Sequence, residues 1–128
     1  MYRRCEVFLL PARTVIDPDN PKGEGFGIVF LEAMAFGKPI IGPNYGAPAE
    51  LIRHGECGFL VDPEDPAAVA DALLHLLNAP QEAKSMGESA SRWVRQEYSF
   101  NSLCQRLEKL LVDSGYVIRN LPNRGAAL

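Results

Sequence analysis

The sequence has little of what disulfide-rich, nucleic-acid-binding or membrane-spanning proteins require. Its 128 residues include three cysteines, too few and too widely spaced to indicate a disulfide framework. The net charge is −3, with 13 basic and 16 acidic residues interspersed, so no basic footprint for nucleic acid is indicated. The first apolar run, Val7–Leu10, is shorter than a secretory signal (about 7 residues or more) or a membrane span (about 20). These absences favour a cytoplasmic protein that binds no nucleic acid.

Ordinary globular composition accompanies these absences: 47% of the residues are hydrophobic and 23% are charged, in a length suited to one compact domain. Short apolar runs predict strands at Val7–Leu10, Pro39–Ile41 and Phe59–Val61, the first of them buried on both faces. Helices are predicted over Phe26–Phe36, from Pro48 to His54, and in three amphipathic segments that begin at Asp65, at Pro80 and at Ser99 or Asn101. This alternation predicts an α/β fold with short parallel strands, helices on both faces and a helical C-terminal end. Three strands make it a partial Rossmann-like domain.

The segment Phe26–Phe36 is unusual because nearly all of its side chains are apolar. Such a composition predicts a helix that is buried all round, ended by Gly37 and Pro39. Glu32 is the exception, and a buried carboxylate needs hydrogen-bond donors or a proton. Vicinal hydroxyls of a ribose or a nearby basic residue would both satisfy it, and the residues alone leave the two interpretations open.

Two loops rich in glycine and proline follow the first two predicted strands, at residues 11–25 and 42–47. Ligands of parallel α/β sheets bind outside the carboxyl ends of the strands, where these loops lie. The run Glu24-Gly-Phe-Gly27 stands where the first loop meets the helix, and its glycines would let an anion approach the free N–H groups. The plainer alternative is a tight loop-to-helix turn.

Glu24 and Glu32 are eight positions apart, about 12 Å along an ideal helix. That separation is too long for a general acid and base that act on one bond. It fits two contacts at opposite ends of one extended ligand, with a phosphate between them.

The segment from Glu24 to Glu32, Glu-Gly-Phe-Gly-Ile-Val-Phe-Leu-Glu, resembles the E-x7-E motif of retaining GT-B glycosyltransferases of family GT4. The flanking stretches agree, among them Glu32-Ala-Met-Ala-Phe-Gly-Lys-Pro-Ile-Ile, Gly55-Glu-Cys-Gly-Phe-Leu-Val and Asp65-Pro-Ala-Ala-Val-Ala. The resemblance covers about residues 5 to 112. It is to the C-terminal, donor-binding domain, and within the family it is greatest to phosphatidylinositol mannosyltransferases.

The resemblance implies a role for each residue of the motif. Glu24 is the implied catalytic residue, beside the donor sugar, and Glu32 would hold the ribose. Backbone groups of residues 25–27 would bind the sugar hydroxyls, and the amides of Ile28 and Val29 the phosphate. The implied donor-binding set is therefore Gly25, Phe26, Gly27, Ile28, Val29 and Glu32. No metal and no cofactor are implied, since the nucleotide sugar, GDP-mannose or a UDP-sugar, is the substrate.

On this resemblance residues 1–113 would be part of a donor domain and residues 114–128 an irregular tail. The partner implied is an N-terminal acceptor-binding domain, with peripheral membrane contact in the full-length enzyme. We expect the chain alone to transfer no sugar, because it encodes one wall of the cleft. Two alternatives remain open, a non-catalytic sugar-nucleotide-binding module and a fragment of a GT-B sugar-nucleotide epimerase. The E-x7-E spacing favours the transferase.

Overall fold

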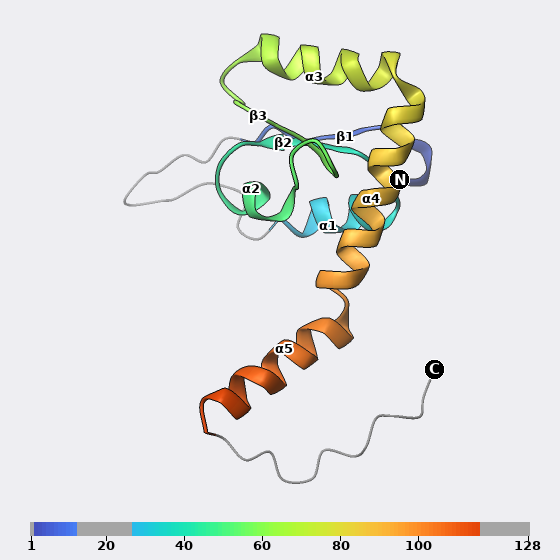
Figure 1. Ribbon diagram of the computed structural model, residues 1–128. Coiled ribbons are helices and arrows are strands. Elements are labelled where there is room, and N and C mark those ends of the chain that lie inside the picture. The colour runs from blue at the N-terminus through green and yellow to red at the C-terminus, as the bar shows by residue number, and fades with distance from the viewer. Residues whose placement is uncertain (1, 13–26, 116–128) are drawn as a thin grey trace. The chain divides into compact units, whose positions relative to one another are not determined.

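The computed structural model describes residues 2–12 and 27–115 of the chain (Figure 1). The chain divides into two compact units, Met1–Arg95 and Gln96–Leu128. The first unit contains the sheet and its covering helices, and the second contains the last helix. Each is described by itself.

The sheet consists of three parallel strands in the order β1-β2-β3. In this register Phe8 lies opposite Ile40, and Ile40 lies opposite Gly58. The strands are β1 (Phe8–Leu9), β2 (Ile40–Pro43) and β3 (Gly58–Val61). Parallel strands need long crossovers, and helices supply them here.

Helices cover both faces of this sheet, with α3 on one side and α1 and α2 on the other (Figure 1). A 3-10 turn, η1 (Tyr2–Arg4), precedes β1. The helices are α1 (Ile28–Ala35), α2 (Ala47–Leu51), α3 (Pro66–Asn78), α4 (Pro80–Glu97) and α5 (Phe100–Asp113). The prediction of an α/β fold with short parallel strands between helices is confirmed.

The two isoleucines of β2 show how the core is divided. Ile40 and Ile41 are both fully buried, and successive side chains of a strand point to opposite faces. On one face, Ile41 belongs to a cluster from β3, α3 and α4 that contains Val61, Leu76, Ala83 and Met86. On the other face, the bare Gly42 lies against Phe30 and Ile52, since a Cβ there would be 3.2 Å and 2.7 Å from their side chains.

The first strand differs from its prediction in length and in burial. The sequence predicts Val7–Leu10 as a strand buried on both faces, but β1 has two residues, and 37% of Leu9 is exposed. The reason is its place in the sheet: among the described strands β1 is an outer one, paired through the N–H groups of Phe8 and Leu10 with β2. A short apolar run carries no information about which strand lies at an edge.

The prediction that the helix following Gly27 is buried all round is wrong. Only Phe30, Ala33 and Met34 of α1 are buried, whereas 58% of Ile28 is exposed. One face of α1 packs against β2 and α2, and the residues that the structure describes leave Ile28 and Glu32 on the other face exposed. An apolar composition does not distinguish a helix covered on every side from one that is covered on one side only.

Helix α3 begins with the cap that the sequence predicts. The Asp65 carboxylate accepts hydrogen bonds from the N–H groups of Ala67 (2.9 Å) and Ala68 (3.1 Å). We expect Asp65→Ala to lower the free energy of unfolding by about 1 kcal/mol, because these two donors lose their acceptor. Urea unfolding would measure the change, with Glu64→Ala, the loss of an exposed neighbouring carboxylate, as the control. Equal losses in the two variants would contradict the role of the cap.

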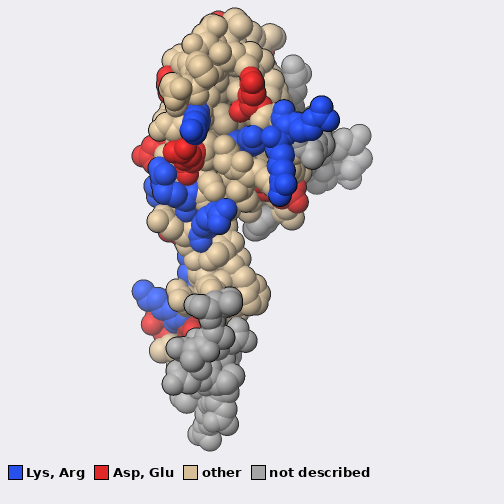
Figure 2. Space-filling model, turned by 90° about the vertical axis from the view of Figure 1, so that its right-hand side faces the viewer, with Lys and Arg blue, Asp and Glu red and all other residues tan. Residues whose placement is uncertain are grey.

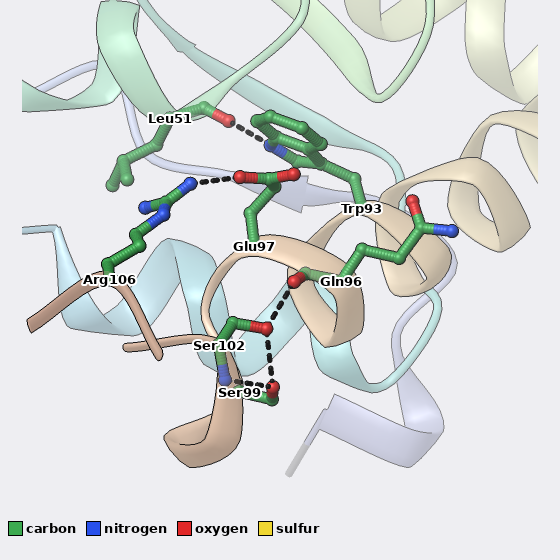
Figure 3. A network of polar contacts seen from close by, with 7 residues as sticks. All are labelled: Leu51, Trp93, Gln96, Glu97, Ser99, Ser102 and Arg106. Carbon is green, nitrogen blue, oxygen red and sulfur yellow. Dashed lines mark hydrogen bonds and ion pairs between the residues drawn. The ribbon is translucent and has the colours of Figure 1, made fainter. Parts of the chain in front are cut away.

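The second unit contains α5, which Ser99 caps through its hydroxyl, 3.2 Å from the Ser102 amide nitrogen. Figure 3 also shows the ion pair of Arg106 with Glu97 and the hydrogen bond from the Ser102 hydroxyl to the Gln96 carbonyl. None of the side chains of α5 is buried. In the described ranges, no helix has both the length and the apolar character needed to span a membrane.

Candidate functional site

The candidate site is built on the first turn of α1, where Gly27 is the N-cap residue. Gly27 has φ 75° and ψ 27°, the left-handed conformation that glycine adopts without a steric cost. A Cβ at this position would lie 2.8 Å from Leu51 Cδ1 and 3.3 Å from Phe30 Cδ2. The left-handed backbone conformation favours glycine here, and a larger residue would also have to displace the Leu51 side chain.

Two N–H groups at this end of α1 lack an acceptor in the part of the chain that the structure describes. The Phe30 N–H donates to the Gly27 carbonyl over 3.0 Å, but the N–H groups of Ile28 and Val29 have no acceptor among the residues that the structure describes. These orphan donors and the positive end of the helix dipole favour an anion. Glu24, Gly25 and Phe26 lie outside the described residues.

The second predicted ligand loop, residues 42–47, follows the next strand. Its Asn44 N–H donates to the Val61 carbonyl over 2.9 Å, which ties the loop to the end of β3. Gly46, with φ 69°, is the N-cap residue of α2. Because β1 and β2 are parallel, this loop and the segment that follows β1 start from the same edge of the sheet.

Helix α4 contacts the residues that pack against the candidate site through Trp93. The indole Nε1 of Trp93 donates to the Leu51 carbonyl over 3.1 Å (Figure 3), and the Arg53 guanidinium lies 3.6 Å from the centre of the indole ring. Leu51 in turn packs against Gly27. No sequence signal links Trp93 to Leu51, 42 positions away.

Glu32 is exposed, so the prediction of a buried carboxylate is wrong. Its Oε2 accepts a hydrogen bond of 2.8 Å from the hydroxyl of Tyr2, whose ring stacks on Phe36 at 5.6 Å between centroids. The hydrogen bond to Glu32, with a smaller contribution from burial, raises the pKa of Tyr2 above its usual value. The basic partner considered for Glu32 is not found among the described residues.

A parallel α/β sheet with a helix N-terminus at its carboxyl edge is the arrangement found in Rossmann-type domains, many of which bind nucleotides. Residues 1–93 match the family model "Glycosyl transferases group 1", and the chain belongs to this family.

Three similar proteins support the assignment. The chain is 37% identical over 107 residues to a GDP-mannose-dependent alpha-(1-6)-phosphatidylinositol monomannoside mannosyltransferase of Mycobacterium tuberculosis, covering 84% of this chain and 27% of that protein. The C-terminal domain of a group 1 glycosyl transferase (LpcC) from Francisella tularensis has a TM-score of 0.66 at 27% identity, covering 77% of this chain and 46% of that one. HepE of Anabaena, in complex with UDP-glucose, has a TM-score of 0.70 at 25% identity, covering 88% and 29%. The chain thus spans about a quarter of the length of the mycobacterial relative.

Proposed function

We propose that this chain is the donor-binding part of a retaining GT-B glycosyltransferase of family GT4, and that it binds a nucleoside-diphosphate sugar. The observation that carries the proposal is the first turn of α1. Gly27 adopts there the left-handed conformation that favours glycine, and the N–H groups of Ile28 and Val29 lack acceptors among the described residues.

The donor would lie along the E-x7-E segment, with the sugar at its start, the diphosphate in the middle and the ribose at its end. The amides of Ile28 and Val29 would bind the diphosphate, and the backbone of residues 25–27 the sugar hydroxyls. Glu24 would be the catalytic residue beside the sugar, and Glu32 would hold the ribose. The exposure of Glu32 supports this last role, because a ligand can reach a carboxylate at the surface. Helix N–H groups and basic residues would neutralise the diphosphate without a metal or cofactor.

The nucleotide and the partners are proposed from the relatives. The mycobacterial relative is described as GDP-mannose-dependent, which supports GDP-mannose as the donor, and the UDP-glucose complex of HepE supports a UDP-sugar as the second choice. An N-terminal domain would bind the acceptor, and the complete enzyme would be cytoplasmic with peripheral membrane contact. Glycosyl transfer needs donor and acceptor in near-attack geometry, an effect worth about 7–11 kcal/mol of barrier, so the chain alone would transfer no sugar.

Glu32→Ala tests the ribose contact. We expect the variant to lose about 1.5–3 kcal/mol of GDP binding free energy, because a carboxylate that accepts from the ribose hydroxyls is removed. Calorimetry with GDP would measure the loss, and Glu88→Ala, which removes an exposed carboxylate of α4, is the matched control.

A second ligand, which lacks the ribose hydroxyls, distinguishes the loss of a ribose contact from the effect of removing a negative charge. The analogue 2′,3′-dideoxy-GDP should bind the parent chain more weakly than GDP does, and should bind the Glu32→Ala variant as well as GDP does. Tyr2→Phe keeps the carboxylate and should leave GDP binding intact. If a folded Glu32→Ala variant binds GDP as tightly as the parent, the ribose assignment is wrong.

A further inference from the structure

A second cavity region lies at the opposite end of the sheet from the candidate donor site. It has a volume of about 640 Å³. It is lined by η1 and the segment before β1, the turn between α1 and β2, the last turn of α3 and the first turn of α4. The donor site begins at the other end of α1, whose eight residues extend about 12 Å. The two sites therefore share no residue.

Four cations line this cavity, which we call the basic pocket: Arg3, Arg4, Lys38 and Lys84. Its lining contains one carboxylate, that of Glu6. The lining has a formal charge of +3 in a chain whose net charge is −3, so the positive charge is concentrated against the overall balance. Figure 2 faces this end of the molecule and shows lysine and arginine side chains gathered there.

Within residues 2–12 and 27–115, the cations of the basic pocket form no ion pair. The ion pairs of the described residues involve Arg53, His75 and Arg106, and none involves a cation of the pocket. The side chains of Arg3, Arg4 and Lys84 are exposed. With one carboxylate among four cations, the lining keeps an excess of positive charge, and an anion in the cavity would reduce the repulsion among the cations.

The remaining lining of the pocket indicates what kind of anion fits. Leu76 and Ala83 are buried and form part of an apolar floor, which suits a carbon skeleton. Helix α4 begins in the lining at Pro80, but the C-terminal ends of α1 and α3 also reach it, near Gly37 and at Leu77, so the helix dipoles oppose one another and the positive charge comes from the side chains. Lysine and arginine side chains are typical binding groups of phosphates.

We propose that the basic pocket binds a phosphate-bearing anion at a site separate from the donor site. The cations at its rim bind the phosphate, and the apolar floor contacts the rest of the ligand. Such binding weakens as salt is added, because exposed charges are screened within about 10 Å at 0.1 M ionic strength.

The site is located by ¹H–¹⁵N NMR spectra of the 128-residue chain, titrated with inorganic pyrophosphate. We expect saturable shifts at the amides of Arg3, Arg4, Lys38 and Lys84, which report on the pocket. The amides of Ile28 and Val29 report on the donor site in the same spectra, so failure of one site is distinguished from failure of the other.

Arg4→Gln combined with Lys84→Gln tests the cations. We expect about tenfold weaker binding at the pocket amides, since two exposed charge contacts are lost. Arg92→Gln combined with Lys109→Gln removes the same charge elsewhere and should leave the affinity within about twofold. If the two double variants weaken pyrophosphate binding equally, and if the amides of the basic pocket do not shift, the proposal is wrong.

Vesicle sedimentation separates a soluble phosphate from a lipid headgroup. Vesicles of phosphatidylcholine alone are compared with vesicles that also contain phosphatidylglycerol. Pyrophosphate shifts without vesicle binding identify a soluble phosphate as the ligand. If the parent binds the anionic vesicles and only the Arg4→Gln/Lys84→Gln variant loses this binding, the ligand is a lipid headgroup. If neither probe binds at the pocket, or if the pocket variant binds both as the parent does, the proposal is wrong.

Discussion

Gly87→Ala is expected to lower the free energy of unfolding by about 3 kcal/mol, although the same change at an exposed helix position raises it by about 1 kcal/mol. Gly87 lies in the middle of α4, where a Cβ would be 2.1 Å from the Gly37 carbonyl oxygen and 3.3 Å from Pro39 Cδ. The backbone of that turn is constrained, since Gly37 has φ 69° and ends α1. Neither partner is a flexible side chain that can move aside, so the steric cost exceeds the gain in helix propensity.

The sign of this effect makes the test decisive. Urea unfolding of Gly87→Ala is compared with that of Ser85→Ala, which places an alanine at an exposed position of the same helix. We expect Ser85→Ala to be neutral or slightly stabilising. A Gly87→Ala variant that is more stable than the parent would show that α4 does not approach the α1–β2 turn as described.

Phe30→Ala is expected to cost about 3–5 kcal/mol, the range for truncation of a large buried aromatic side chain. Phe30 is fully buried, its ring meets that of Phe8 edge-on at 5.7 Å between centroids, and it lies beneath the bare Gly42. Phe30 also packs against Gly27, so its truncation removes a side-chain contact of the N-cap residue of α1.

The control for this variant lies in the same turn. Ile28→Ala truncates a side chain that is 58% exposed and should change the free energy of unfolding by less than about 1 kcal/mol. Thermal and urea unfolding give both values. Similar losses in the two variants would contradict the assignment of Phe30 to the core.

Features that depend on a few adjacent residues were predictable from the sequence. Asp65 before Pro66 caps α3, Ser99 caps α5, and Gly37 ends α1 in a left-handed conformation, as the residue types indicate. Each of these depends on hydrogen bonds or dihedral angles within one turn, which local sequence determines.

Features that depend on distant contacts were not predictable. The apolar neighbours of Glu32 predict a buried carboxylate, but in the described part of the chain Glu32 is exposed and accepts a hydrogen bond from the Tyr2 hydroxyl. The approach of Gly87 to Gly37 joins segments 50 positions apart, and the Trp93 bond to Leu51 spans 42. The phosphate-binding roles of Ile28 and Val29 remain predictions, as do those of residues 24–26, which lie outside the described ranges.

Helix α5 has a thermodynamic consequence of its own. Among the residues that the structure describes, no side chain of α5 is buried, so within its own unit little apolar packing opposes the unwinding of this helix. A helix of 14 residues is marginal in water without such packing, so we expect the free energy of opening α5 to be small. The backbone amides of α5 should therefore exchange with solvent far faster than those of β2, whose isoleucines are fully buried.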